Sequence, residues 1–249
     1  MTPTIKTITL RTNITLHPRD IKYWRKGLSV LAGFEHEALH NHNTDGSVQY
    51  RHPTISYRSE NGKAVLFGYG DEAVFLLLQL VQQKENQTIY IGIHKTLFSI
   101  ASCNIENHSL VQSDEAEHKY GIFDWLGLNE ANYSLWLNTD RAADRMLQLE
   151  QILAANILAF CKSVQWFLPA GSLKIMLINE PTITKTRFKE LDLLKFDVVF
   201  KTNIVLPNGI GLGKASAHGF GKLRQISIAP IVAAKPVKKL QLKEVLSEE

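Results

Sequence analysis

The sequence predicts a mixed α+β fold, because runs rich in β-branched residues alternate along the chain with amphipathic runs and turn signals. Residues 4–12 alternate in the period-two pattern that is typical of a strand. Asp20 follows Pro18 and opens an amphipathic run over residues 21–31 that stops at Gly33, which predicts a helix. The chain is therefore expected to begin as a strand followed by a helix.

Two further β-like runs, at residues 48–57 and 63–69, are joined by Asn61-Gly62, a turn signal that predicts a hairpin. A helical run at residues 72–83 follows, and an alternating, isoleucine-rich run at residues 88–94 predicts a fourth strand. The order β-α-β-β-α-β is that of a ferredoxin-like unit. We expect this N-terminal domain, which includes a histidine-rich loop, to occupy residues 1–95.

The second half of the chain predicts a similar but elaborated unit over residues 96–228. Its expected elements are strands at residues 97–105, 119–126, 173–183, 194–206 and 225–228 and a long helix at residues 140–167. The expected fold is thus two ferredoxin-like (RRM-like) units in tandem, with residues 229–249 as a charged tail. Such sheets are a common RNA-binding platform, but the architecture alone does not decide function.

Composition places the chain among ordinary globular proteins. It has 249 residues, of which 45% are hydrophobic and 21% charged. The longest apolar run, residues 73–78, falls short of the roughly 18 residues that a membrane span needs, and the N-terminus has no secretory signal pattern. Two cysteines cannot make a disulfide framework, which favours a reducing compartment. We therefore expect a cytoplasmic protein with no membrane partner.

The charge is mildly basic, with a formal net charge of +4. Lysine and arginine outnumber acidic residues from Lys195 onward, and three of the four acids there stand at the very end of the chain. This basic C-terminal third predicts either an anion-binding face or a solvated rim, and charge alone leaves both open.

The segment between residues 34 and 43 contains two overlapping histidine patterns. The string His36-Glu37-x-x-His40 matches the pattern in which two histidines bind zinc and the glutamate activates water. That pattern needs a stable helix, whereas only seven residues separate Gly33 from Asn41, and no third ligand follows at the usual spacing. A zinc hydrolase is kept as the third interpretation.

The second pattern uses His40 and His42 without a metal. In an extended segment their side chains leave the same face, and imidazoles titrate near neutrality, so one can accept a proton while the other donates one. This pair suits RNA cleavage, in which the ribose 2′-OH supplies the nucleophile and no cofactor is needed. Tyr50 can hydrogen-bond the 2′-OH or a phosphate, and Lys26 can stabilise negative charge in the transition state. Two surface histidines in a polar loop remain the alternative.

A third candidate site is the glycine-rich stretch at residues 208–222, with five glycines in thirteen residues. Glycine lets backbone N–H groups approach a phosphate closely. Ala215 after Lys214 excludes a P-loop, which needs serine or threonine there. The alternative is a bulged hairpin that needs glycine only for packing. The candidate RNA-binding residues are Gly209, Gly211, Gly213, Lys214, His218, Gly219, Gly221, Lys222 and Arg224.

These motifs carry a family resemblance. Residues 209–221, ending in His218-Gly219-Phe220-Gly221, resemble the C-terminal glycine-rich loop of the repeat-associated RNA-binding (RAMP) superfamily found in CRISPR systems. The string His40-Asn41-His42, followed by Tyr50 and the run to Tyr57, resembles the b-type branch of the Cas-six precursor-RNA endoribonucleases. The resemblance covers about residues 5–228 and implies two ferredoxin-like halves.

The resemblance implies metal-independent cleavage within the CRISPR repeat, which leaves a 5′-hydroxyl and a 2′,3′-cyclic phosphate or its 3′-phosphate relative. It places the catalytic imidazoles on His40 and His42 and the assisting phenol on Tyr50. Relatives carry a lysine just before the histidines, but residues 31–33 contain none, which leaves Lys26, Lys214 or His218 to supply the charge.

The implied partner is CRISPR repeat RNA, the precursor crRNA. An alternative from another class is a non-catalytic RNA-binding subunit of a CRISPR effector complex, which would share the fold and the glycine-rich stretch. The sequence leaves open whether the chain joins effector-complex subunits or forms a homodimer.

Overall fold

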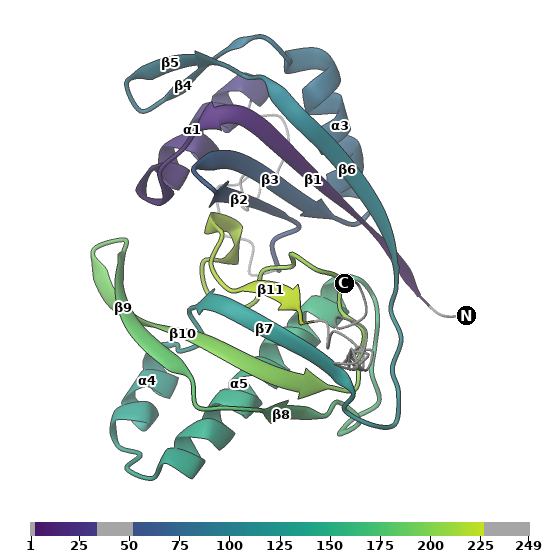
Figure 1. Cartoon of the computed structure of the whole chain (residues 1–249), viewed down its shortest axis with the longest axis vertical. Helices are drawn as coiled ribbons and strands as arrows, with labels where there is room; N and C mark the ends of the chain where they lie inside the picture. Colours follow the sequence, from purple (N-terminus) through teal and green to yellow (C-terminus); the bar gives the residue numbers. More distant parts are fainter. Residues whose placement is uncertain (1–2, 34–51, 227–249) are drawn as a thin grey trace, which may run out of the picture.

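The computed structural model of the chain describes residues 3–33 and 52–226. Their elements form an N-terminal lobe, at the top of Figure 1, and a C-terminal lobe below it. The N-terminal lobe contains β1 (Thr4–Thr15), η1 (Pro18–Asp20), α1 (Ile21–Ala32), β2 (Ile55–Glu60), β3 (Lys63–Tyr69), α3 (Asp71–Lys84), β4 (Thr88–Ile91), β5 (His94–Leu97) and β6 (Ile100–Ser109). The C-terminal lobe contains β7 (His118–Trp125), α4 (Glu130–Leu137), α5 (Ala142–Ser163), β8 (Ile175–Leu177), β9 (Thr182–Phe188), β10 (Leu191–Thr202), η2 (Ser216–His218) and β11 (Lys222–Gln225). The tail expected at residues 229–249 and the first part of the strand expected at residues 48–57 lie outside the described residues.

The N-terminal sheet has four strands in the order β2-β3-β1-β6, and each strand runs antiparallel to its neighbours. The first strand of the chain thus lies in the interior of the sheet, as a ferredoxin-like unit requires. The alternation of β1 sends Ile8 and Leu10 to one face, where they share a core with Trp24 and Leu28 of α1 and Leu77 of α3. The expected ferredoxin-like fold is confirmed for this lobe.

The assignment of residues 88–94 as the fourth strand of this sheet is wrong. Those residues form β4, which pairs with β5 in a separate two-stranded hairpin. Ile89 and Ile91 are buried in the same core as α1, so their alternation reflects packing against a helix. The approach is close: a Cβ on Gly27 would lie 2.3 Å from the carbonyl oxygen of Tyr90. The fourth strand is β6, and the N-terminal sheet therefore extends to Ser109, beyond the boundary expected at residue 95.

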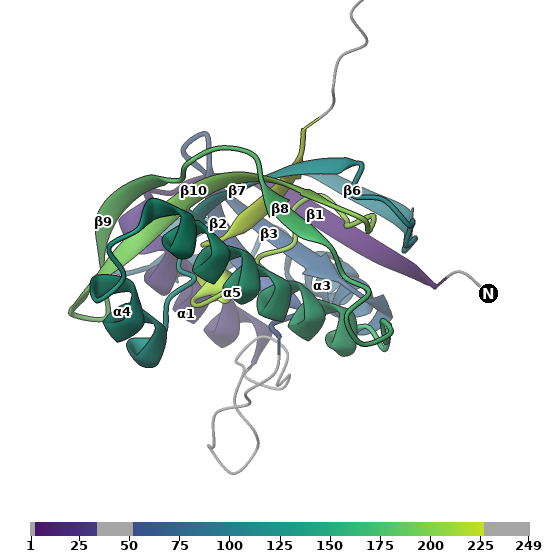
Figure 2. The same ribbon diagram turned by 90° about the horizontal axis from the view of Figure 1, so that it is seen from below.

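The C-terminal sheet repeats this arrangement in the order β11-β7-β10-β8, with β9 pairing along the other end of β10. The strand expected at residues 173–183 is split into β8 and β9, which pair with different parts of the long β10. The predicted long helix is α5, which with α4 covers one face of this sheet (Figure 2). None of the helices in the two described ranges combines the length and the hydropathy that a membrane crossing requires.

The C-terminal unit departs from a ferredoxin-like unit between β10 and β11. A second long helix would be expected there, but the chain instead follows an irregular course through the glycine-rich stretch, with only the short η2. The last strand, expected at residues 225–228, is β11 and begins three residues earlier. This is the elaboration that the sequence indicated for the second unit.

The two lobes share part of their core. Ile5, Phe67 and Tyr69 of the N-terminal lobe are buried in the same cluster as Phe160 of α5 and the apolar face of the C-terminal sheet. The rings of Tyr69 and Phe160 lie 5.3 Å apart, edge to face. The lobes are therefore packed directly on each other at one end.

Candidate nucleic-acid interface

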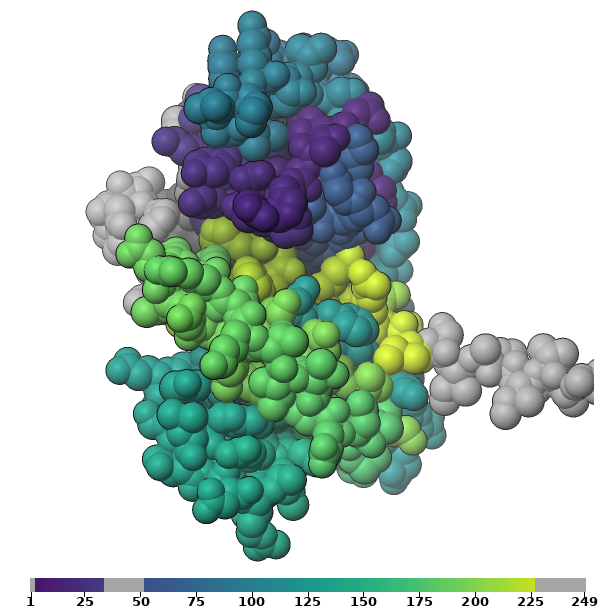
Figure 3. Space-filling model, turned by 60° about the vertical axis from the view of Figure 1, so that its left-hand side comes forward, coloured from purple at the N-terminus to yellow at the C-terminus, as the bar shows by residue number. Residues whose placement is uncertain are grey.

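The glycine-rich stretch lies between the two lobes, as the yellow-green atoms between them in Figure 3 show. It folds back along β11: the Gly209 N–H donates to the Leu223 carbonyl, and the Leu223 N–H donates to the Ile210 carbonyl, both at 2.9 Å. The Lys214 N–H donates to the Leu126 carbonyl at 3.0 Å, just beyond β7. These backbone bonds fix the stretch at the junction of the lobes.

Three of the glycines are buried, and packing explains why a side chain is excluded at each. A Cβ on Gly209 would lie 2.9 Å from the Phe67 ring, and one on Gly211 would lie 2.9 Å from the Cβ of Ser216. Gly221 has φ +63°, and a Cβ there would lie 1.9 Å from the Leu212 carbonyl oxygen. These positions therefore serve the close fit of the stretch, and its polar side chains are the groups that reach the surface.

Arg58 of β2 connects the N-terminal lobe to this stretch. Its side chain is 4% exposed, donates from Nη2 to the Gly209 carbonyl and lies over the Phe67 ring with Cζ 4.4 Å from the centroid. Burial lowers the pKa of Arg58 to about 10, although the neighbouring Glu60 opposes that shift. The guanidinium therefore stays charged at neutral pH.

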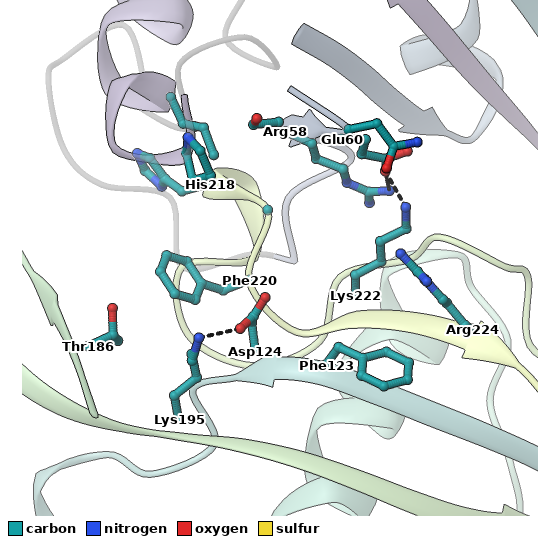
Figure 4. Close-up of a pocket in the computed structure, with 15 residues that line it drawn as sticks. Arg58, Glu60, Phe123, Asp124, Thr186, Lys195, His218, Phe220, Lys222 and Arg224 are labelled. Carbon is teal, nitrogen blue, oxygen red and sulfur yellow. Dashed lines mark hydrogen bonds and ion pairs between the residues drawn. The ribbon is translucent and has the colours of Figure 1, made fainter. Parts of the chain in front are cut away.

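Glu60, at the end of β2, joins three cations from different strands. Its carboxylate accepts hydrogen bonds from Arg11 Nη1 at 2.9 Å and from Lys222 Nζ, and Arg58 Nη1 lies 3.8 Å away. Burial alone would raise the pKa of Glu60, but hydrogen bonds from Lys222 and Arg11 and the charges of Lys222 and Arg58 lower it to about 2. Lys222 belongs to β11, so this ion pair crosses between the lobes, as Figure 4 shows.

The Glu60–Lys222 ion pair stands between two adjoining hollows. The larger, which we call the junction cleft, has a volume of about 400 Å³, and its charged lining residues are Arg58, Glu60, Asp124, Lys195, Lys222 and Arg224. The smaller, of about 320 Å³, shares Arg58, Glu60, Lys222 and Arg224 and extends along β1 and β6. Among these charged residues of the junction cleft, four are cations and two are acids, so the surface is suited to an anion.

His218 of η2 lines the junction cleft on the side next to α1. Its Nε2 lies 3.4 Å from Arg25 Nη1 of α1, and its ring meets the Phe188 ring edge to face at 5.3 Å. Burial, followed by the charges of Arg25 and Lys189, lowers the pKa of His218 to about 4. The imidazole is therefore neutral near pH 7 and can accept a hydrogen bond.

The structure brings Lys222, Arg224, His218 and Gly219 of the predicted RNA-binding set into the junction cleft. Lys214 is exposed and, with Gly213, lines a separate hollow along α5. Lys26 is exposed on α1 and lines none of these hollows.

Sequence reasoning missed Arg58, Glu60, Phe123 and Lys195. They come from strands of two lobes that are far apart in the chain, so no local motif marks them.

His52 was also missed, although it stands two residues after Tyr50. Its Nδ1 lies 2.6 Å from the Tyr69 hydroxyl, which in turn lies 3.1 Å from Ser163 Oγ on α5. Burial lowers the pKa of His52 to about 4, against hydrogen bonding to the backbone of Gly211 and Pro53. His52 therefore lies beside the glycine-rich stretch, at the junction of the lobes.

Several predicted site residues lie outside the described residues: His36, Glu37, His40, His42 and Tyr50. In the two described ranges, no cluster of three or more histidine, cysteine or acidic side chains could hold a metal ion. Both the histidine pair and the zinc interpretation thus remain predictions.

Two family models match consecutive parts of the chain. The Cas6b N-terminal domain matches residues 3–109, and the Cas6b C-terminal domain matches residues 112–226. A curated relative, an uncharacterized protein of Methanocaldococcus jannaschii, is 30% identical over 105 residues, which cover 42% of this chain and 69% of that protein. The family resemblance drawn from the histidine string and the glycine-rich stretch is confirmed.

Solved structures of CRISPR-associated proteins share this fold. A crystal structure of Cas6b is 24% identical, covers 90% of this chain and all of its own, and superposes with a TM-score of 0.77. A crystal structure of the CRISPR RNA processing endoribonuclease Cas6b is 20% identical with the same coverage and a TM-score of 0.67. Csf5, a type IV CRISPR-Cas crRNA endonuclease, is 12% identical, again covers 90% and 100%, and gives a TM-score of 0.53. At these identities the likeness establishes the two-lobed fold.

Proposed function

Because the chain belongs to the Cas6b family of CRISPR RNA processing endoribonucleases, we propose that it binds the repeat of precursor crRNA at the junction of its lobes and cuts it without a metal ion. The observation that carries the binding half of this proposal is the junction cleft, where Arg58, Lys195, Lys222 and Arg224 come together from three strands of two lobes. Contacts between such cations and phosphates supply essentially all of the sequence-independent affinity of a protein for a nucleic acid.

The chemistry is assigned to His40 and His42. One imidazole takes the proton of the ribose 2′-OH, whose oxygen attacks the adjacent phosphorus. The P–O bond to the next nucleotide breaks, and the other imidazole gives its proton to the leaving 5′ oxygen. The products are a 2′,3′-cyclic phosphate and a 5′-hydroxyl, so the step balances without water or metal. Tyr50 assists as a hydrogen-bond donor.

Charge on the phosphate rises during the attack, and a nearby cation would stabilise it. The residues considered for this role are Lys26, Lys214 and His218. Because the low pKa of His218 keeps its imidazole neutral near pH 7, the two lysines are the remaining candidates. Lys214 lines the same hollow as His52, which stands close in sequence to Tyr50. We therefore favour Lys214 for this role over Lys26, which lines none of the hollows described above.

The deciding experiment compares the wild type with the double variant His40→Ala, His42→Ala on labelled repeat RNA. We expect the variant to bind the RNA but to lose cutting, and we expect wild-type cutting to persist in excess EDTA. A deoxyribose at the cut site should block cleavage and spare binding.

A variant that cuts normally would overturn the proposed mechanism. A wild type that binds the RNA and leaves it intact would instead identify a non-catalytic subunit. Stoichiometric zinc in the pure protein, with cutting lost in EDTA, would favour the His36, Glu37 and His40 interpretation.

Reducing conditions fit the proposed site of action, the cytoplasm, where CRISPR transcripts are made. Cys103 is exposed and Cys161 is buried, and both are free thiols.

A CRISPR effector-complex subunit and a second copy of the chain are the protein partners we would test by measuring the mass of the native assembly.

A further inference from the structure

We propose that Phe123, on β7, is a stacking platform for an unpaired nucleobase of the bound RNA. The inference rests on the proposed function and deepens it, because it specifies that the RNA strand in the junction cleft is single-stranded. Phe123 lines that cleft and is 36% exposed, which is unusual for a phenylalanine in the interior of a strand.

The surface of the sheet has room for the Phe123 ring over a glycine. A Cβ on Gly121, two residues earlier on the same face of β7, would lie 2.8 Å from Phe123 Cζ and 2.9 Å from Cε2. The absence of a side chain at Gly121 thus lets the ring lie along the strand, with Cζ and Cε2 over Gly121. The ring contacts Arg224 on its other side, and a ligand can take the place of that side chain.

Cations surround the Phe123 ring. In the register of β7 and β11, Lys222 is directly opposite Phe123, and Arg224 is directly opposite Gly121, so all four residues share one face of the sheet. The Arg224 guanidinium lies 5.5 Å from the centroid of the Phe123 ring (Figure 4). A flat cation already occupies the position that a flat base would take, and the exposed, flexible Arg224 can turn from the ring to a phosphate.

The combination of an aromatic ring that Arg224 can uncover and adjacent cations suits single-stranded RNA. Bases of a duplex stack on one another and do not offer a free face, whereas an unpaired base can stack on an aromatic ring while its phosphate is held by lysine or arginine. Phe220, the other phenylalanine lining the cleft, is half-buried and packs edge to face on Phe188 at 5.6 Å. The geometry therefore selects Phe123 rather than Phe220.

The test measures binding of three variants to two probes at a series of salt concentrations. The probes are a single-stranded oligoadenylate that carries a fluorescent base quenched by stacking, and a blunt RNA duplex of the same length. Phe123→Leu keeps an apolar side chain and removes the ring, Phe123→Trp keeps a flat ring, and Phe75→Leu is the matched control on α3. Phe75 is 64% exposed and lines neither hollow of the junction.

We expect Phe123→Leu to bind the single strand about tenfold more weakly, with less quenching. Its affinity for the duplex and the salt dependence of binding should be unchanged. Phe123→Trp and Phe75→Leu should resemble the wild type. Equal affinity of Phe123→Leu and wild type for the single strand would overturn the inference, as would an equal loss on both probes.

Wild-type cutting of repeat RNA, measured beside these assays, separates the two proposals. If the wild type cuts the repeat and Phe123→Leu binds the single strand normally, only the stacking inference fails. If the wild type neither binds nor cuts repeat RNA, the proposed function fails and this inference fails with it.

Discussion

The Glu60 carboxylate lies among three cations, and these contacts make its contribution to the stability of the fold depend on pH. It is 15% exposed and interacts with Arg11, Arg58 and Lys222, so burial is outweighed and its pKa falls to about 2. A carboxyl group whose pKa is lower in the folded state than in the unfolded state stabilises the fold at pH values above its unfolded-state pKa. This stabilisation is lost as the pH falls through its folded-state pKa. The relevant window therefore runs from about pH 4.5 down to about pH 2.

We predict that Glu60→Gln lowers the free energy of unfolding at pH 7 by about 1–3 kcal/mol, because three cations lose their carboxylate. The measurement is urea unfolding at a series of pH values. The difference between variant and wild type should shrink as the pH falls through the window given above. Glu117→Gln, at an exposed loop position, should change the free energy little at any pH. A difference that stays constant down to pH 2 would contradict the role assigned to Glu60.

Among the elements, the long regular ones were predictable from the sequence and the pairing of strands was not. The period-two pattern of residues 88–94 indicated a strand correctly but could not show that it packs on α1 rather than in the sheet. The true fourth strand, β6, corresponds to the strand that the sequence predicts at residues 97–105 and places in the second unit. It is exposed along most of its length, so it lacks the apolar alternation that would have linked it to the N-terminal core. Its place is set by pairing with β1, a tertiary contact.

The glycine-rich stretch likewise shows which features of the site the sequence could predict and which it could not. Its composition indicated a special backbone, and Lys222 and Arg224 do line the junction cleft. Gly209, Gly211 and Gly221 are buried against neighbouring atoms, so packing alone accounts for the absence of a side chain there. Phe67, the neighbour of Gly209, belongs to the other lobe, and the neighbours of Gly211 and Gly221 are brought close only by the fold of the stretch itself.

We predict that Gly221→Ala destabilises the protein far more than Gly171→Ala, although both glycines have positive φ, +63° and +73°. Nothing lies within 4 Å of a Cβ on Gly171, so that change should cost only the left-handed conformation, about 1–2 kcal/mol. At Gly221 the overlap with the Leu212 carbonyl adds to this cost, for a total of about 2–5 kcal/mol. Urea unfolding of the two variants measures the difference, and equal losses would show that the stretch relaxes around the new methyl group.

At the scale of the whole molecule, the cationic surface is assembled from both lobes and should dominate RNA binding. Arg58 and Arg11 come from the N-terminal sheet, whereas Lys195, Lys222 and Arg224 come from the C-terminal one. The basic C-terminal third indicated by the sequence accounts for only the second group.

We predict that Arg224→Gln weakens binding of single-stranded RNA and reduces the slope of log affinity against log salt by about 0.7, the value for one lost phosphate contact. The measurement is a salt titration of binding. The control is Lys84→Gln, at the end of α3 and away from both hollows of the junction. It removes the same single positive charge as Arg224→Gln and should leave the slope unchanged. Equal slopes for wild type and Arg224→Gln would exclude this arginine from contact with the RNA backbone.

The shared packing of Tyr69 on Phe160 has a consequence for how the chain can be divided. Each ferredoxin-like unit resembles an autonomous module in its strand order, yet either one produced alone would leave Ile5, Phe67 and Tyr69, or the surface of α5 that receives them, in contact with water. Two separately expressed halves would therefore be prone to aggregation and would gain solubility on being mixed, in spite of the internal repetition of the chain.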